Sequence, residues 1–251
     1  MAGTGAHFVL VHGAWHASWC WDQLKLDLES KGHTVDAVDL PGRADPAEAS
    51  ATTLDDCVAL VLKRVSASPD PVVLVAHSFG GITATQAAAL APDRIRHLVY
   101  LCAFVPRDGE CMLDLAAAEE FQPSLAARHQ RLDLDHGLSY PPEDQAIEAF
   151  FGTCDPEAAR TAAGRLIPEG LALFAQPVSA GADTVGRLRR TYIEARQDRA
   201  IPIAAQRAMR HAAGIDDVRT IDSDHSPFLS RPGELAGILH AIASGGSPAG
   251  L

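Results

Sequence analysis

Short runs of β-branched and other apolar residues alternate along the chain with longer stretches of helical periodicity. The runs that predict strands lie at 8–11, 34–38, 72–75, 98–101, 191–194 and 218–221. The stretches that predict helices lie near 18–30, 53–66, 79–91, 202–212 and 232–243. Because parallel strands are joined by crossover helices, this alternation predicts an α/β fold: a mostly parallel sheet of six or more strands, flanked by helices.

One interval, 106–187, interrupts the alternation. It contains no convincing strand, and Ala-, Glu- and Pro-rich pieces such as 113–120 and 156–163 dominate it. Since it is too long for a structureless connection in a compact domain, we expect a helical cap inserted into a core formed by 1–105 and 188–245. A pair of surface helices without a role in substrate access is the alternative. The Gly/Ser-rich end, 246–251, is predicted to be a flexible tail.

Composition excludes several classes of partner. The formal net charge of −11 over 251 residues argues against nucleic acid, which requires clustered cations. No apolar run is long enough to span a membrane, and the amino terminus lacks the pattern of a secretion signal. The five cysteines are odd in number and form no C-x-x-C pair, which predicts free thiols and a cytoplasmic protein rather than a disulfide framework or a zinc site. No feature of the sequence indicates the oligomeric state.

The most informative segment is 72–81, Val-Val-Leu-Val-Ala-His-Ser-Phe-Gly-Gly, in which an apolar strand runs into a turn that opens a helix. A small-x-Ser-x-Gly turn between a strand and a helix is typical of a nucleophile elbow, which projects the serine hydroxyl above the sheet. Ser78 is therefore the candidate nucleophile, although Ala76 replaces the usual glycine. An N-cap serine is the alternative, and it fits less well because two glycines follow.

A serine hydroxyl needs a base and a group that orients the base. The last predicted strand leads into the turn-rich segment 222–228, which makes His225 the candidate base. Asp198 follows the fifth predicted strand and is the candidate acid, in the chain order Ser, Asp, His that this kind of site uses. Asp108, after the preceding strand, is the rival acid. Asp224 is interpreted as a turn residue, because adjacent residues rarely orient one another.

Two backbone N–H groups are needed to stabilise an oxyanion. Phe79, directly after the nucleophile, supplies one, and Ala14 supplies the other on the loop after the first strand, where Gly13 permits a tight turn. The four-residue spacing of His12 and His16 raises zinc binding as a competing hypothesis. We predict no metal site, because the segment follows a strand directly and lacks the glutamate of an H-E-x-x-H motif.

Four segments together resemble the plant methylesterase and hydroxynitrile lyase family of the α/β-hydrolase superfamily, and bacterial pyrethroid-type carboxylesterases. These are 9–21, with its His-Gly-Ala-Trp-His run, the elbow 76–81, the stretch 192–202, and the turn ending at His225. The resemblance covers nearly the whole chain and implies the α/β-hydrolase fold. In that family the aspartate of an Asp-x-x-Ile-Pro loop is the acid, which favours Asp198 over Asp108.

The resemblance also bears on the reaction. Lyase members carry a lysine directly after the catalytic histidine and a threonine after the first histidine of the early loop, whereas this chain has Ser226 and Gly13 there. Hydrolysis of a carboxylic ester, without a cofactor, is therefore expected. Trp15 and Phe104, with Phe79, suggest a small, largely apolar substrate. A thioesterase, acyl-transfer or chain-release enzyme of biosynthesis is the main alternative, and a hydroxynitrile lyase and a non-catalytic small-molecule binding protein are the others.

Overall fold

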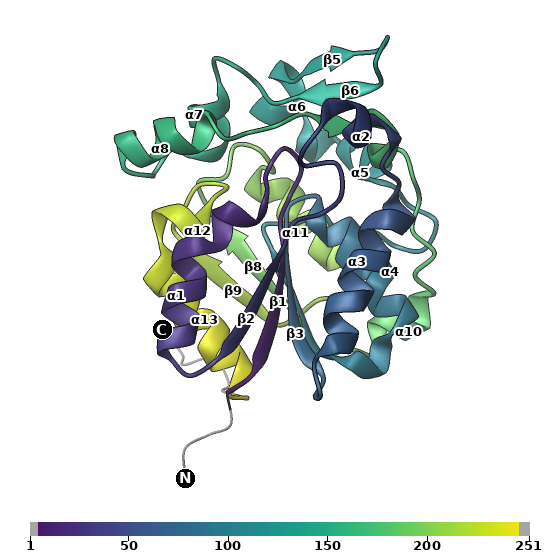
Figure 1. The fold of residues 1–251 in the computed structure, drawn as a ribbon, viewed down its shortest axis with the longest axis vertical. Helices are drawn as coiled ribbons and strands as arrows, with labels where there is room; N and C mark the ends of the chain where they lie inside the picture. Colours follow the sequence, from purple (N-terminus) through teal and green to yellow (C-terminus); the bar gives the residue numbers. More distant parts are fainter. Residues whose placement is uncertain (1–4, 246–251) are drawn as a thin grey trace.

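The computed structural model describes residues 5–245 and contains a six-stranded sheet in the order β2-β1-β3-β4-β8-β9 (Figure 1). Every neighbouring pair in this sheet is parallel. Its strands are β1 (His7–Val11), β2 (Thr34–Val38), β3 (Val72–His77), β4 (Ile95–Leu101), β8 (Arg190–Ala195) and β9 (Val218–Ile221). The predicted α/β fold with a parallel sheet is confirmed, and each predicted strand is present.

Helices cover both faces of the sheet, which explains why its strands are apolar at successive positions. Side chains alternate between the faces: Phe8 and Leu10 of β1 pack in one cluster, and Val9 and Val11 in the other. The first cluster includes side chains of α1 (Asp22–Ser30) and α13 (Pro232–Ala243). The second includes side chains of α3 (Leu54–Ala67), α4 (Gly80–Leu90) and α11 (Ile203–Ala212). Figure 1 shows α1 and α13 on one side of the sheet and α3 and α4 on the other.

The predicted helices of the core are all present, and short elements join them. The region 18–30 is a 3-10 turn, η1 (Ser18–Trp21), followed by α1. Short elements that the sequence pattern does not reveal are α2 (Pro46–Ala51), η2 (Pro92–Arg94) and α12 (Pro227–Ser230). Helix α3 begins with a capping box, in which Thr53 Oγ1 accepts from the Asp56 N–H and Asp56 Oδ2 accepts from the Thr53 N–H.

The interval 106–187 contains helices and a small sheet, so the prediction that it lacks strands is wrong. Its three-stranded antiparallel sheet comprises β5 (Arg131–Asp133), β6 (Leu138–Tyr140) and β7 (Glu169–Gly170). Its helices are α5 (Met112–Ala116), η3 (Glu119–Phe121), α6 (Leu125–His129), α7 (Ala146–Phe150), α8 (Pro156–Ala163), α9 (Leu171–Phe174) and α10 (Ala182–Gly186). Strands of two or three residues are too short to produce a detectable alternation.

Much of this interval lies above the carboxyl ends of the main strands, where Figure 1 shows α5, α6, α7 and α8 with β5 and β6. We call 106–187 the cap, and its limits remain a prediction. Arg43, on the loop after β2, forms a buried ion pair with Glu169 of β7 and so joins the core to the cap. The predicted tail, 246–251, lies outside the described residues. Within residues 5–245 no helix is both long and apolar enough to cross a membrane.

Candidate active site

The predicted site residues lie beyond the carboxyl ends of four strands of the main sheet. Ala14 follows β1, Ser78 follows β3, Asp198 follows β8 and His225 follows β9. The strand order changes direction at β1, with β2 on one side and β3 on the other. Crevices beyond the carboxyl ends of strands at such a point are the usual ligand sites of open parallel sheets. The topology thus brings together residues that are up to about 200 positions apart in the sequence.

Ser78 has the strained backbone of a nucleophile elbow. Its φ angle is 54°, in the left-handed region that a residue with a Cβ seldom adopts. The Phe104 N–H donates to the Ser78 carbonyl at 3.1 Å, which helps to hold the turn. A Cβ at Gly80 would lie 2.6 Å from the His12 carbonyl oxygen, and one at Gly81 would lie 2.0 Å from that of Phe104. The two glycines are therefore required by the close approach of α4 to β1 and to the loop after β4.

His225 and Asp198 form a buried hydrogen-bonded pair. His225 Nδ1 donates to Asp198 Oδ2 at 2.7 Å, and both side chains are almost completely inaccessible to solvent. Asp198 Oδ1 accepts from the backbone N–H groups of Ala200 at 2.7 Å and Ile201 at 2.8 Å. Burial raises the pKa of Asp198, against the opposing effects of His225 and these amides. With Asp198 ionised, the proton of neutral His225 lies on Nδ1, which leaves Nε2 free to act as a base.

Ser78 and His225 line one cavity beneath the cap. The cavity has a volume of about 80 Å³ and is bordered mainly by apolar side chains. Trp15 and Phe104, the two residues predicted for the substrate pocket, both lie in its wall. Phe150 of α7 contributes another ring, at 5.8 Å from the Trp15 ring and 5.7 Å from the His225 ring. The side chains thus enclose a site that favours an apolar group beside the Ser78 hydroxyl.

The predicted oxyanion donors, Ala14 and Phe79, line the same cavity. Among the described residues, neither backbone N–H has a hydrogen-bond acceptor. His12 holds the Gly13–Ala14 peptide: its Nε2 accepts from the Leu40 N–H at 3.1 Å, so its Nδ1 donates to the Gly13 carbonyl at 2.8 Å. The carbonyl and N–H of a trans peptide point in opposite directions, so anchoring the Gly13 carbonyl also orients the Ala14 N–H.

His12 and His16, the pair considered for zinc binding, make hydrogen bonds to the backbone. Both ring nitrogens of His12 are bonded to the backbone, and His16 Nδ1 donates to the Ala14 carbonyl at 2.8 Å. Burial lowers the pKa of His12 to about 3 and that of His16 to about 4, so both rings are neutral near pH 7. These histidines therefore shape the loop that carries Ala14.

Two residues next to the site were not singled out by the sequence. His77 Nε2 donates to the backbone carbonyl of His225 at 2.8 Å, and Cys102 Sγ lies 3.6 Å from the same oxygen. Donor atoms of His77, Cys102 and His225 lie within 4.8 Å of one another. His225 Nδ1 is bonded to Asp198, and His77 Nε2 is bonded to the His225 carbonyl. These contacts hold the loop that carries His225 in position. All five cysteines are free, as predicted.

Asp108, the rival acid, lies at the start of the cap and bonds to another part of it. Its Oδ1 accepts from the backbone N–H groups of Ala180 at 2.9 Å and Gly181 at 3.1 Å. It therefore fixes the chain near α10, whereas His225 is bonded to Asp198.

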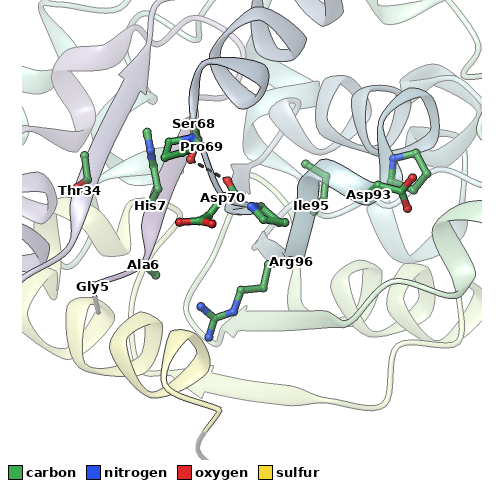
Figure 2. A pocket seen from close by; sticks show the side chains of 12 residues that line it. Gly5, Ala6, His7, Thr34, Ser68, Pro69, Asp70, Asp93, Ile95 and Arg96 are labelled. Atoms are coloured by element: carbon green, nitrogen blue, oxygen red, sulfur yellow. Dashed lines mark hydrogen bonds between the residues drawn. The ribbon is translucent and has the colours of Figure 1, made fainter. Parts of the chain in front are cut away.

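A second, larger cleft lies at the opposite, amino-terminal ends of the strands (Figure 2). It has a volume of about 730 Å³ and is lined by residues at the starts of β1, β2 and β4. Two of its polar groups are used within the fold: Ser68 Oγ donates to the Asp70 carbonyl at 2.7 Å, and Arg96 bonds to the Ala243 carbonyl. None of its lining residues belongs to the Ser78 site.

Comparisons with known proteins show which family this chain resembles. The sequence model of the alpha/beta hydrolase family matches residues 8–238. Methylesterase 7 of Arabidopsis thaliana is 33% identical over 94% of this chain and 95% of its own length. The crystal structure of polyneuridine aldehyde esterase has a TM-score of 0.80 at 27% identity and covers 95% of this chain and 99% of that one.

A pyrethroid hydrolase from Sphingobium faniae JZ-2 is a further structural neighbour. Its crystal structure has a TM-score of 0.85 at 24% identity, with 96% of this chain and 98% of that chain covered. At that identity the likeness is one of fold. The predicted resemblance to plant methylesterases is confirmed by the sequence relatives, and the resemblance to pyrethroid hydrolases is confirmed by the structural neighbour.

Proposed function

Because the chain belongs to the alpha/beta hydrolase family, we propose that it is an esterase that uses Ser78, His225 and Asp198 as a catalytic triad. The observation that carries the proposal is the buried His225–Asp198 hydrogen bond of 2.7 Å, at a cavity that Ser78 also lines. This bond leaves His225 Nε2 as the free basic atom beneath the cap. Relatives named as esterases support hydrolysis of a carboxylic ester.

In the proposed mechanism, Ser78 Oγ attacks the ester carbonyl and His225 Nε2 takes the hydroxyl proton. The N–H groups of Ala14 and Phe79 stabilise the oxyanion, and Asp198 stabilises the imidazolium. Collapse of the tetrahedral intermediate breaks the bond to the alcohol, which leaves with the proton from His225. Water then attacks the acyl-Ser78 ester with His225 again as base, releasing the acid and restoring the serine. No metal or organic cofactor takes part in these steps.

The substrate is proposed to be a small ester with an apolar portion. Trp15, Phe79, Phe104 and Phe150 surround the cavity, so little in the wall would solvate a charged group. A cytoplasmic location is proposed on the basis of the five free thiols.

The main alternative is cleavage or transfer of an acyl thioester, which would use the same triad. A hydroxynitrile lyase is disfavoured by Ser226 and Gly13, at positions where lyases that resemble this sequence carry lysine and threonine. A non-catalytic binding protein would have no need for the strained backbone at Ser78.

Steady-state assays on matched substrates separate these activities. We expect the purified protein to hydrolyse nitrophenyl acetate and butyrate with a higher kcat/KM than the corresponding acyl thioesters, and Ser78→Ala to abolish both activities. Cleavage of a cyanohydrin by the wild type at a rate comparable to ester hydrolysis would favour the lyase. Absence of turnover on every substrate would favour the binding protein.

A further inference from the structure

Asp224 precedes His225 and is buried, with 1% of its surface exposed. Its Oδ1 accepts from the Ser226 N–H at 2.9 Å, and its Oδ2 accepts from the Thr153 N–H at 2.8 Å. Asp224 also donates its own N–H to Thr153 Oγ1 at 3.2 Å, and Cys154 Sγ donates to Oδ2 at 3.4 Å. The two carboxylate oxygens therefore bind two different segments: Oδ1 binds the segment after His225, and Oδ2 binds the turn at 153–154.

The Oδ1 contact fixes the peptide group that follows His225. Asp224 holds the Ser226 N–H at one end of this peptide, and His77 Nε2 holds the His225 carbonyl at the other, at 2.8 Å. Together with the bond from His225 Nδ1 to Asp198, these contacts anchor both the side chain and the backbone of the histidine. The orientation of Nε2 thus depends on Asp224 as well as on Asp198.

The Oδ2 contact reaches into the cap. Thr153 and Cys154 lie between α7 and α8, and only Gly152 separates them from the pair Phe150 and Phe151. Phe150 lines the cavity, and its ring lies 5.7 Å from that of His225. The turn that Asp224 holds therefore determines where this part of the cavity wall lies relative to the base.

We propose that Asp224 is a positioning residue that couples the cap to His225, with one carboxylate oxygen fixing the His225–Ser226 peptide, and with the other oxygen and the Asp224 N–H together fixing the cap turn at 153–154 through Thr153. This inference rests on the proposed function, in which His225 is the base. It differs from the sequence-based interpretation of Asp224 as a turn residue, because the decisive partner, Thr153, is 71 positions away.

An asparagine cannot reproduce the coupling. Each carboxylate oxygen of Asp224 accepts from a backbone N–H, whereas an amide offers one oxygen and one NH2 group. In Asp224→Asn the NH2 group would face either the Ser226 or the Thr153 N–H, leaving a buried donor unsatisfied. Asp222→Asn is the matched control, because Asp222 is in the same loop and its side chain is 59% exposed.

The first test combines kinetics with hydrogen exchange on the full chain. In Asp224→Asn we expect kcat for nitrophenyl acetate to fall at least about 10-fold at temperatures well below Tm, with a smaller change in KM. We expect faster amide exchange at both 153–154 and 225–226, while the central strands stay protected. Asp222→Asn should match the wild type. Unchanged kcat in folded Asp224→Asn, or faster exchange in only one of the two segments, would overturn the proposal.

If Asp224→Asn does not fold, Thr153→Val is the variant that tests the proposal. It removes the acceptor for the Asp224 N–H while keeping the side-chain volume close to that of threonine. We expect faster exchange at 224–226, with a several-fold lower kcat, and unchanged exchange there would contradict the coupling. Exchange does not depend on esterase activity. A wild type without activity would refute the proposed function, while correlated exchange would still support the contact between cap and loop.

Discussion

Gly13 lies so close to Ser78 that a methyl group added to Gly13 would come within 2.6 Å of Ser78 Cβ and 3.1 Å of its Oγ. Real side chains do not make contacts that short, so either the loop after β1 or the elbow would have to move. The loop is anchored by His12 and the elbow by Phe104, so neither can move without losing a hydrogen bond. The loop that carries Ala14 and the turn at Ser78 therefore fix each other's positions.

Gly13→Ala should consequently disable the site. We expect a fall in kcat/KM of at least about 10²-fold, comparable to the loss of one oxyanion donor. Ester hydrolysis and Tm measured on the same preparation check this. Gly237→Ala, where an added methyl group meets no atom within 4 Å, is the matched control and should keep full activity. A folded Gly13→Ala protein of normal activity would show that this approach is not needed.

Asp198 and Asp108 are distinguished by their asparagine variants. Asp198→Asn exchanges the acceptor of the His225 Nδ1–H for an amide and favours the wrong tautomer, so kcat should fall by as much as ~10⁴-fold. Asp108→Asn affects only contacts with the 180–181 amides and should leave kcat within a few-fold of the wild type. Equal losses of kcat in the two variants, measured at temperatures where both are folded, would contradict the choice of Asp198 over Asp108 as the acid.

The buried histidines predict acid destabilisation. His16 has a pKa of about 4 in the folded protein and near 6.5 in an unfolded chain. Between these values the unfolded chain binds a proton that the folded chain does not, so the free energy of unfolding falls as pH falls, by about 1.4 kcal/mol per pH unit for this group. His12 acts in the same direction, whereas Asp198, whose pKa is raised, acts in the opposite one.

His16→Gln isolates one of these contributions. Urea unfolding at pH 6.0, 5.5 and 5.0 should give a pH dependence shallower than that of the wild type, by up to about 1.4 kcal/mol per pH unit. Both proteins share His12 and Asp198, so the difference between their slopes reports mainly on His16. His211→Gln, at an exposed position on α11, should leave the slope unchanged. An unaltered slope in His16→Gln would mean that His16 titrates similarly in both states.

Phe104 is predicted to limit the size of the group beside Ser78. It lines the cavity and stacks on Phe121, with ring centroids 5.4 Å apart. Phe104→Ala should enlarge the cavity enough to bury about two more CH2 groups of the acyl chain. At ~0.8 kcal/mol for each, the ratio of kcat/KM for a nitrophenyl hexanoate to that for the acetate should rise at least about 10-fold. Leu90→Ala, at an exposed end of α4, should not change the ratio. A constant ratio in Phe104→Ala would place the acyl chain elsewhere.

The strands of the main sheet could be predicted because each is four or more residues long, and because the central strands are buried on both faces and therefore apolar at successive positions. Errors occur where polar residues enter them: β4 begins at Ile95, but Arg96 and His97 mask its start, so the prediction begins at 98. The cap sheet could not be predicted, because its strands are two or three residues long and partly exposed.

The candidate site likewise contains residues that the sequence predicts and residues that it does not. Ser78, Asp198 and His225 have signatures in the sequence, since each follows a recognisable strand. His77 and Asp224 have none, because their partners include backbone groups 148 and 71 positions away. A carbonyl or an N–H is present in almost every residue, so no residue type marks such a contact. These contacts are visible only once the chain is folded.

The most direct test of the Ser78 triad is covalent labelling by a fluorophosphonate, followed by intact-mass measurement of the wild type and of Ser78→Ala. The account predicts a single adduct on the wild type, mapped by peptide mass to the elbow 76–81, and none on Ser78→Ala. His225→Ala should label at a rate at least about 10²-fold lower, because the hydroxyl lacks its base. An unlabelled wild type, or an equal adduct on Ser78→Ala, would contradict the assignment of Ser78 as the nucleophile.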